Sequence, residues 1–299
     1  MSSVLTIRNL SKRYGHIQAV NDVSFEVERE SVFGILGPNG SGKTTTLGIV
    51  LDVIKSDVGS YSWFDSERHT NDIKRRVGAI LETPNFYPYL SGHKNLKIVA
   101  DIKGVPYSKI TTVLDKVSLL GRKDSRFKEY SLGMKQRLAI ASALLSDPEV
   151  LVLDEPTNGL DPEGIRQIRD LIKQIASEGK TIILASHLLD EVEKVCTHVG
   201  ILKSGNLLKY GNVNEILSEE VLLEVATDNL AALKAAIAEY PSLSLIDEVN
   251  GKLSVKSLDP ALNATTLNKS LLEKGIVLNH LVSKKSSLED QFLKIVKGK

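Results

Sequence analysis

The stretch GPNGSGKTT, residues 37–45, decides the fold of this 299-residue chain. The run SVFGILG, which leads into it, has the pattern of a buried strand, and KTTTLGIVLD, which begins inside it, has that of a helix. A strand, a glycine-rich turn and a helix in this order form the context that a phosphate-binding loop requires. A glycine-rich turn without a ligand is the alternative, and this context disfavours it.

The residue types in this loop suit the phosphates of a nucleotide. Its glycines allow backbone N–H groups to surround the β- and γ-phosphates. Lys43 places a cation on these phosphates, and the hydroxyl of Thr44 is a ligand for Mg²⁺. We therefore expect a nucleotide site that is formed by Gly37, Pro38, Asn39, Gly40, Ser41, Gly42, Lys43, Thr44 and Thr45.

The composition is that of an ordinary globular chain with 42% apolar and 25% charged residues, and its length suggests about two domains. The net charge of +1 predicts no general affinity for polyanions, so nucleic-acid binding is not expected. The lone Cys196 excludes an internal disulfide and fits a reducing compartment. No secretory signal is visible, and no apolar run approaches the ~20 residues of a membrane span. We expect that the chain does not cross a bilayer by itself.

Strands and helices alternate over the first part of the chain, which we predict to be one α/β domain over residues 1–217. Buried strand patterns such as VLVLD and TIILAS favour a parallel sheet. Residues 83–147 change character and are predicted to form a helical insertion. Asp161 before Pro162 and Gly179 further on predict a helix over residues 162–177.

A second pattern begins at residue 218 and continues to residue 299. Its order is β-α-β-β-α-β, with a hairpin around Asn250 and Gly251, a last strand over residues 276–283 and a closing helix. We predict a small accessory α+β domain with a ferredoxin-like fold. It contains no glycine-rich phosphate loop, so we do not expect it to be catalytic.

Two carboxylates follow the strand VLVLD of residues 150–154. A buried strand delivers Asp154 to the carboxyl edge of the sheet, where it can bind Mg²⁺ through water. Glu155, next to it, would polarise the attacking water. A solvated turn is the alternative for this pair taken alone, and the upstream phosphate loop disfavours it.

These motifs, in their order, resemble the ATP-binding cassette (ABC) family from Leu5 to about Leu217. The resemblance implies an ABC nucleotide-binding domain with a mixed sheet and an inserted helical subdomain. It implies that Tyr14 in KRYG stacks on adenine and that His187 in ASHLLDE contacts the γ-phosphate. It also implies that Asp161 in NGLD belongs to a loop that meets the partner subunit of a dimer.

The stretch YSLGMKQRL, residues 130–138, has the pattern of a helix whose first N–H groups form a natural anion site. A plain serine N-cap is the alternative. The stretch lies where the family signature Leu-Ser-Gly-Gly-Gln lies, and of that signature it keeps Ser131 and Gly133. In the family this helix end caps the γ-phosphate that the opposite subunit holds. The resemblance therefore implies ATP shared between two copies or paralogues.

Glu82 in AILETPNFYPYLSG departs from the family, which has glutamine here, close to Mg²⁺ and water. Glutamate in this place resembles cassettes that export or resist peptide antibiotics such as lantibiotics and bacitracin; a misaligned surface glutamate is the alternative. We expect the residues that follow Glu82 to form an exposed apolar knob, which suits a groove against a partner helix. The knob consists of Pro84, Phe86, Tyr87, Pro88 and Tyr89.

The function that we predict is Mg²⁺-dependent ATP hydrolysis, with Glu155 and His187 as catalytic residues and Thr44, Glu82 and Asp154 as metal ligands. By resemblance, the chain drives a bacterial exporter of a peptide, an antibiotic or a lipid-like molecule from the cytoplasmic face of the membrane. Its expected partners are an integral membrane permease and a second cassette, identical or paralogous. A soluble ABC-type mechanical ATPase and a nonhydrolytic binding module are the alternatives.

Overall fold

The chain forms two compact units, and the boundary between them along the sequence lies between Gly211 and Asn212. The computed structural model describes residues 2–66, 70–82, 85–218, 221–257, 259, 262–285 and 288–297. The sequence placed the boundary at residue 217. The structure places it earlier because helix α8 (Val213–Ser218) packs against α11 (Leu288–Lys297), so that both helices belong to the second unit.

A six-stranded sheet forms the centre of the first unit, with the order β5-β6-β7-β3-β8-β9. The first five of these strands run parallel. Every residue of β3, β6 and β7 is buried, which explains their continuous apolar sequences. The bounds are β3 (Val32–Leu36), β5 (Val77–Ile80), β6 (Val150–Asp154), β7 (Thr181–Ser186), β8 (His198–Lys203) and β9 (Asn206–Asn212).

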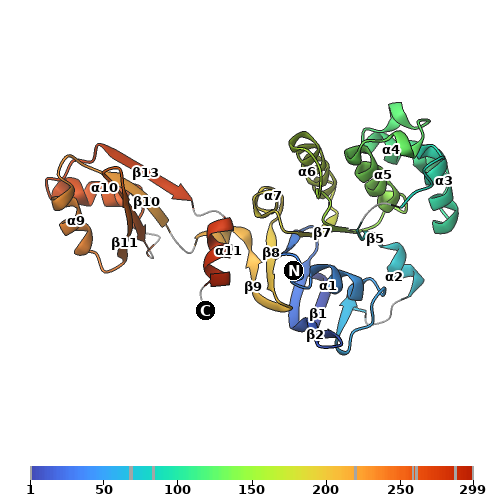
Figure 1. Ribbon diagram of the computed structural model, residues 1–299, viewed down its shortest axis with the longest axis horizontal. Coiled ribbons are helices and arrows are strands. Elements are labelled where there is room, and N and C mark those ends of the chain that lie inside the picture. The colour runs from blue at the N-terminus through green and yellow to red at the C-terminus, as the bar shows by residue number, and fades with distance from the viewer. Residues whose placement is uncertain are drawn as a thin grey trace. The chain divides into compact units, whose positions relative to one another are not determined.

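Helices cover both faces of this sheet. Figure 1 shows α6 (Pro162–Ser177) and α7 (Leu189–Val195) on one side and α1 (Lys43–Val50) on the other. Helix α6 has the bounds that its capping residues predict, since the side chain of Asp161 accepts a hydrogen bond from the Gly164 N–H at 2.9 Å. The predicted α/β class is confirmed.

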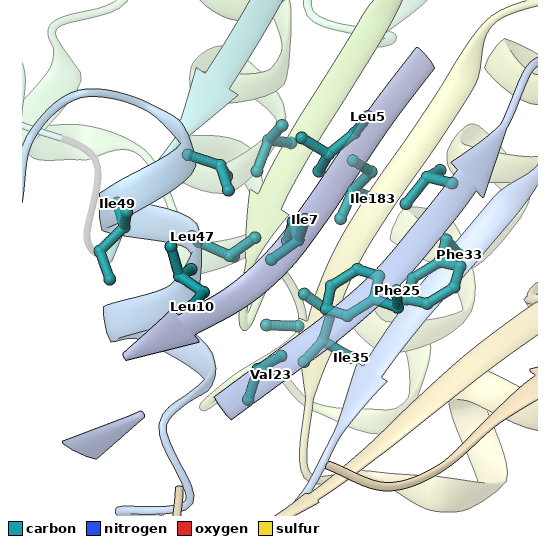
Figure 2. Packing of buried hydrophobic residues seen from close by; sticks show 14 of the residues in the cluster. Leu5, Ile7, Leu10, Val23, Phe25, Phe33, Ile35, Leu47, Ile49 and Ile183 are labelled. Carbon is teal, nitrogen blue, oxygen red and sulfur yellow. The ribbon is translucent and has the colours of Figure 1, made fainter. Parts of the chain in front are cut away.

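A second, antiparallel sheet with the order β2-β1-β4 packs over α1 and the central sheet. It consists of β1 (Ser3–Tyr14), β2 (Ile17–Glu28) and β4 (Val58–Trp63). Figure 2 shows the core between the sheets, where Phe25 and Phe33 stack with their ring centres 5.0 Å apart. At the edge of this core the indole N–H of Trp63 donates to the carbonyl of Val50 at 2.7 Å, and Trp63 is only 4% exposed.

The helical insertion consists of three main helices, α3 (Gly92–Lys103), α4 (Ser108–Lys116) and α5 (Leu132–Leu144). The short helix α2 (Asn71–Arg75) precedes β5, and two single 3₁₀ turns, Leu120–Arg122 and Phe127–Glu129, connect α4 to α5. Lys103 ties α3 to the end of α5, since its ammonium donates to the carbonyls of Ser142 at 2.8 Å and Ala143 at 3.3 Å. Burial lowers the pKa of Lys103 to about 8.

From β10 onward the second unit has the element order that the sequence predicts, whereas α8, which precedes β10, was not predicted. Its sheet has the order β11-β12-β10-β13, and all neighbouring strands are antiparallel. The last strand begins later than the predicted residue 276. The bounds are β10 (Val221–Ala226), α9 (Leu230–Ala238), β11 (Leu243–Val249), β12 (Lys252–Ser257), α10 (Ala264–Glu273) and β13 (His280–Lys285).

One face of this sheet packs against both helices. Leu223 and Val255 from the strands share a buried cluster with Leu233 of α9 and Leu267 of α10. The hairpin between β11 and β12 turns at Asn250 and Gly251, which both have positive φ as a tight two-residue turn requires. Within the described part of the chain, no helix is both long enough and apolar enough to cross a membrane.

Candidate functional site

Residues 37–42 of the predicted phosphate loop join β3 to α1, and residues 43–45 form the first turn of α1. Two of its glycines are required by close packing. A Cβ on Gly42, which has φ 105°, would lie 2.4 Å from the Ala19 carbonyl oxygen, and a Cβ on Gly37 would lie 2.3 Å from that of Leu202. The loop is therefore fixed between β2 and β8. Of its other predicted residues, Pro38, Asn39, Gly40 and Thr44 are exposed and Thr45 is half-buried.

This loop has the electrostatics of an anion site. Lys43 is 5% exposed, and its ammonium donates to the carbonyls of Gly37 at 2.8 Å and Pro38 at 3.3 Å, so the loop curls around the cation. No acidic residue lies in the first turn of α1 to oppose an anion at the helix N-terminus. The buried hydroxyl of Ser41 has no hydrogen-bond partner within the described residues.

Asp154 lies at the carboxyl edge of the same sheet. It ends β6 and pairs with Ala185 of β7, and the next residue of β7, Ser186, pairs with Leu36 at the end of β3. The parallel register thus brings the Asp154 carboxylate to the edge where the phosphate loop begins. Burial raises the pKa of Asp154, although a hydrogen bond from Thr44 opposes this shift.

Two of the residues that are predicted to hold Mg²⁺, Thr44 and Asp154, fit a hard cation. One carboxylate oxygen of Asp154, Oδ1, is buried and has no hydrogen-bond partner within the described part of the chain. The Thr44 hydroxyl contacts the same carboxylate. An unpaired carboxylate oxygen beside a hydroxyl matches the all-oxygen ligands of Mg²⁺.

Glu155 connects two other predicted residues, Lys43 and His187. Its Oε1 lies 3.3 Å from the Lys43 ammonium, and its Oε2 lies 2.8 Å from Nδ1 of His187. The backbone of Glu155 has φ 47°, and its N–H donates to the Ala185 carbonyl at 2.9 Å. This left-handed conformation turns the chain directly after β6, so the carboxylate faces the phosphate loop and the end of β7.

Glu82 and Tyr14 lie at the ends of two other strands, β5 and β1. Glu82 follows β5, is exposed and has φ 57°; its charge contributes to the raised pKa of Asp154. Tyr14 ends β1 and is 47% exposed, and it pairs with Ile17 of β2, two residues before the Ala19 carbonyl that packs against Gly42. The hairpin that carries Tyr14 therefore adjoins the phosphate loop.

Ser131 and Gly133 lie with Asp161 rather than with the phosphate loop. Ser131 caps α5 by accepting a hydrogen bond from the Met134 N–H at 3.3 Å. These residues line one groove of about 490 Å³ between α5 and α6, together with Leu160, and the lining of this groove includes no residue of the phosphate loop. The groove at the start of α5 is thus separate from the phosphate loop of the same chain.

The apolar knob after Glu82 differs from its prediction. Tyr87 and Tyr89 are 62% and 76% exposed, as expected, but Phe86 is half-buried because its ring packs edge-on against Phe127 at 5.2 Å. Asn95 fixes this segment by accepting from the Tyr87 N–H at 2.9 Å. Pro84 lies outside the described residues.

Sequence reasoning missed Lys12 and Asp57, which surround the strand end that carries Tyr14. Their side chains meet at 2.8 Å although they are far apart in the sequence. No spacing pattern could have indicated this pair, because only the pairing of β1 with β4 brings the two residues together.

Comparison with known proteins identifies the family. A family model described as ABC transporter matches residues 20–158. The bacitracin transport ATP-binding protein BcrA of Enterococcus faecalis is 33% identical over 302 residues, which cover 100% of this chain and 98% of that protein. The chain belongs to the ABC transporter ATP-binding proteins. The resemblance that the motifs suggest is therefore confirmed.

Other members of this ABC family agree in sequence and in fold. The lantibiotic transport ATP-binding protein SrtF of Streptococcus pyogenes is 40% identical over 228 residues, covering 74% of this chain and 99% of SrtF. The structure of cbiO1 from Clostridium perfringens, part of the ABC transporter complex cbiONQ, superposes with a TM-score of 0.67 at 28% identity. The superposition covers 73% of this chain and 92% of cbiO1. Like the family, this ABC protein binds ATP and hydrolyses it to power transport.

Proposed function

We propose that this chain is the ATP-hydrolysing subunit of a bacterial exporter, in which two cassettes share ATP and drive a separate membrane permease. The observation that carries this proposal is the position of Glu155 between Lys43 and His187. One carboxylate is thereby held at the junction of the phosphate loop and the end of β7. A carboxylate in this place can take a proton from water that attacks a phosphate.

Mg²⁺ would be held by Thr44 and Asp154, with Glu82 nearby, and would neutralise charge on the phosphates. Residues of the chain itself would bind the terminal phosphate and accept the proton of water. Lys43 exchanges its contact with Glu155 for the terminal phosphate, which leaves the carboxylate free to accept the proton of water. His187 keeps Oε2 of Glu155 oriented through the 2.8 Å contact.

The second half of each site would come from another cassette. The first turn of α5 contains no acidic residue, so its N–H groups and the Ser131 hydroxyl suit a phosphate. Because the groove of Ser131 and Gly133 includes no residue of its own phosphate loop, the phosphate that it caps belongs to a second copy or a paralogue. Asp161, which lines the same groove, would lie at this interface.

The permease would dock where Glu82 and the exposed Tyr87 and Tyr89 lie, which places the chain on the cytoplasmic face of the membrane. The names of two relatives support a peptide antibiotic as the cargo. BcrA is named for bacitracin transport and SrtF for lantibiotic transport. We therefore infer export of a peptide, an antibiotic or a lipid-like molecule. The net charge of +1 favours no nucleic-acid partner.

Affinity purification of the full chain from detergent-solubilised membranes of its source cell tests this proposal. We expect an integral membrane protein to co-purify. Reconstitution of the pair into vesicles should raise ATP hydrolysis above that of the chain alone. Recovery of ribosomal or chromosomal proteins instead of a membrane protein would favour a mechanical ATPase.

A further inference from the structure

We propose that Asp57 and Lys12 are positioning residues for the nucleotide base, which act by fixing Tyr14 and so set the preference for ATP over a bare triphosphate. This inference rests on the proposed role of Tyr14 as the surface on which adenine stacks. Asp57 lies outside the motifs that the sequence identifies, and Lys12, although it begins the stretch KRYG, is given no role there.

Asp57 is bound to three successive residues that lead to Tyr14. Its backbone N–H donates to the Ser11 carbonyl at 2.9 Å. Its Oδ1 accepts from the Lys12 ammonium at 2.8 Å, and its Oδ2 accepts from the Arg13 N–H at 2.7 Å. The pairing of β1 with β2 shifts register between Lys12 and Arg13, and the Asp57 carboxylate binds the residues on both sides of this shift.

Lys12 carries this anchorage to the ring. Its ammonium lies 5.4 Å from the centre of the Tyr14 ring, within the range of a cation–π interaction. The Lys12 side chain is only 16% exposed, whereas Tyr14 remains 47% exposed. The cation therefore supports the ring while much of its surface stays open to a ligand.

The charges make this arrangement stable at neutral pH. The hydrogen bond from Lys12, followed by that from the Arg13 N–H, lowers the pKa of Asp57, so the carboxylate is ionised. Without it the Lys12 ammonium would lose its partner and could swing away from the ring. Asn in place of Asp57 keeps an acceptor for the Arg13 N–H but removes the charge that holds Lys12.

Because of where Tyr14 lies, Asp57 and Lys12 should affect binding of the base rather than binding of the phosphates. Tyr14 pairs with Ile17 on the hairpin whose Ala19 carbonyl lies against Gly42 of the phosphate loop. A nucleotide whose phosphates lie on the loop can therefore reach the ring. Tripolyphosphate has no base, so its binding depends on the loop alone.

Calorimetric titration of the full chain with ATP and with tripolyphosphate, both with Mg²⁺, tests the inference. Asp57→Asn and Lys12→Met should each weaken ATP binding by about 3-fold to 10-fold, the range of a partly exposed cation–π contact. Tripolyphosphate binding should stay within about 2-fold, and KM for ATP should rise with kcat unchanged. Asp52→Asn is the matched control, since Asp52 also pairs with a lysine, Lys74 at 3.0 Å, but on another surface.

The Tyr14→Ala variant separates this inference from the proposed function. In that background Asp57→Asn should cause no further loss of ATP affinity, because its effect passes through the ring. Equal losses for ATP and tripolyphosphate, additive losses in the double variant, or no loss of ATP affinity would each overturn the inference alone. If Tyr14→Ala itself left ATP affinity unchanged, the assignment of the adenine site would fail, and this inference with it.

Discussion

Oε2 of Glu155 lies 2.8 Å from Nδ1 of His187, and the other oxygen of the same carboxylate lies 3.3 Å from the Lys43 ammonium. The three residues come from the ends of three different segments, β6, β7 and the phosphate loop. Both oxygens of the carboxylate are thus held by side chains of the same chain. Its contact with Lys43 is the one that a phosphate would replace.

Glu155→Gln should retain ATP binding while the turnover number falls by roughly 10²-fold or more, the scale of losing a general base. The amide keeps the shape of the side chain but cannot accept a proton from water. Steady-state hydrolysis and calorimetric ATP binding measure the two effects. Glu178→Gln, which removes an acid paired with Lys116 at the far end of α6, is the control and should hydrolyse ATP normally. Unchanged turnover in Glu155→Gln would contradict the assignment.

Lys43→Ala should weaken ATP binding by about 10-fold or more, since hydrogen bonds to charged groups are worth more than neutral ones. Lys43 is the only basic residue of the stretch of residues 37–45. Its loss leaves the Glu155 carboxylate without a cation beside the incoming phosphates, which adds repulsion. Isothermal titration that returned wild-type affinity would refute the role of this lysine.

Glu82→Ala should leave ATP affinity within a few fold of wild type and reduce the hydrolysis that the permease stimulates. Glu82→Gln should be milder, because it restores an oxygen ligand and the shape usual in the family. Glu82→Gly is a useful control, since glycine tolerates the φ of 57° without strain while lacking the carboxylate. ATPase activity of each variant, measured with and without the reconstituted permease, tests this prediction. Wild-type stimulation in all three variants would show that the glutamate is not used in coupling.

Gly133→Asp should prevent ATP-driven pairing of cassettes without unfolding the chain. A Cβ at Gly133 meets only Leu160 Cδ2, at 3.9 Å, so the side chain fits within one subunit, whereas its charge repels the phosphate of the other. Size-exclusion chromatography of the Glu155→Gln chain with ATP should show a dimer that the added Gly133→Asp abolishes. Gly121→Asp, where a Cβ meets no atom within 4 Å, should leave the dimer intact. Equal dimer formation in both would count against the shared site.

Lys103→Met should change the pH dependence of folding. Burial lowers the pKa of Lys103 from 10.5 to about 8, so between these values the unfolded chain binds more protons than the folded chain. The cost of burying the charge is full below about pH 8 and is relieved as the pH rises towards 10.5. Between about pH 7 and about pH 10, the free energy of unfolding of the wild type should rise relative to the variant by about 2–3 kcal/mol.

Urea denaturation followed by far-ultraviolet circular dichroism measures this difference. Lys94→Met, on the exposed side of the same helix, is the control and should show no such change with pH. A constant difference between wild type and Lys103→Met across this range would mean that Lys103 stays charged in the folded chain.

The sequence predicts best those elements whose signals are local. The strands over residues 150–154 and 181–186 are apolar throughout because both faces of the central sheet are covered, and helix α6 is marked by Asp161 at its start. The sequence does not predict strand β4, because Trp63 is the only one of its residues that is buried and no apolar pattern results. The predicted start of β13 at residue 276 was too early, because the Ile276 N–H instead donates to the Leu271 carbonyl and completes the end of α10.

The residues of the candidate site can likewise be divided into those that local sequence identifies and those that only the tertiary structure brings together. Each motif could be found by its own spacing, but the meeting of Lys43, Glu155 and His187 depends on the strand order β6-β7-β3, which no local pattern contains. The anchorage of Tyr14 by Asp57 likewise needs the pairing of β1 with β4. Local motifs therefore identify the chemistry, whereas tertiary pairing determines which side chains support it.

Trp63 is the only tryptophan of the chain, and its indole N–H is bonded to the carbonyl of Val50, the last residue of the helix that begins at the phosphate loop. Intrinsic fluorescence excited at the indole band therefore arises from one buried position. A shift of α1 relative to β4 when nucleotide enters the loop would alter that hydrogen bond and, with it, the wavelength of emission. We expect the unlabelled protein to report nucleotide occupancy in this way, which stopped-flow fluorescence during nucleotide binding and release can test.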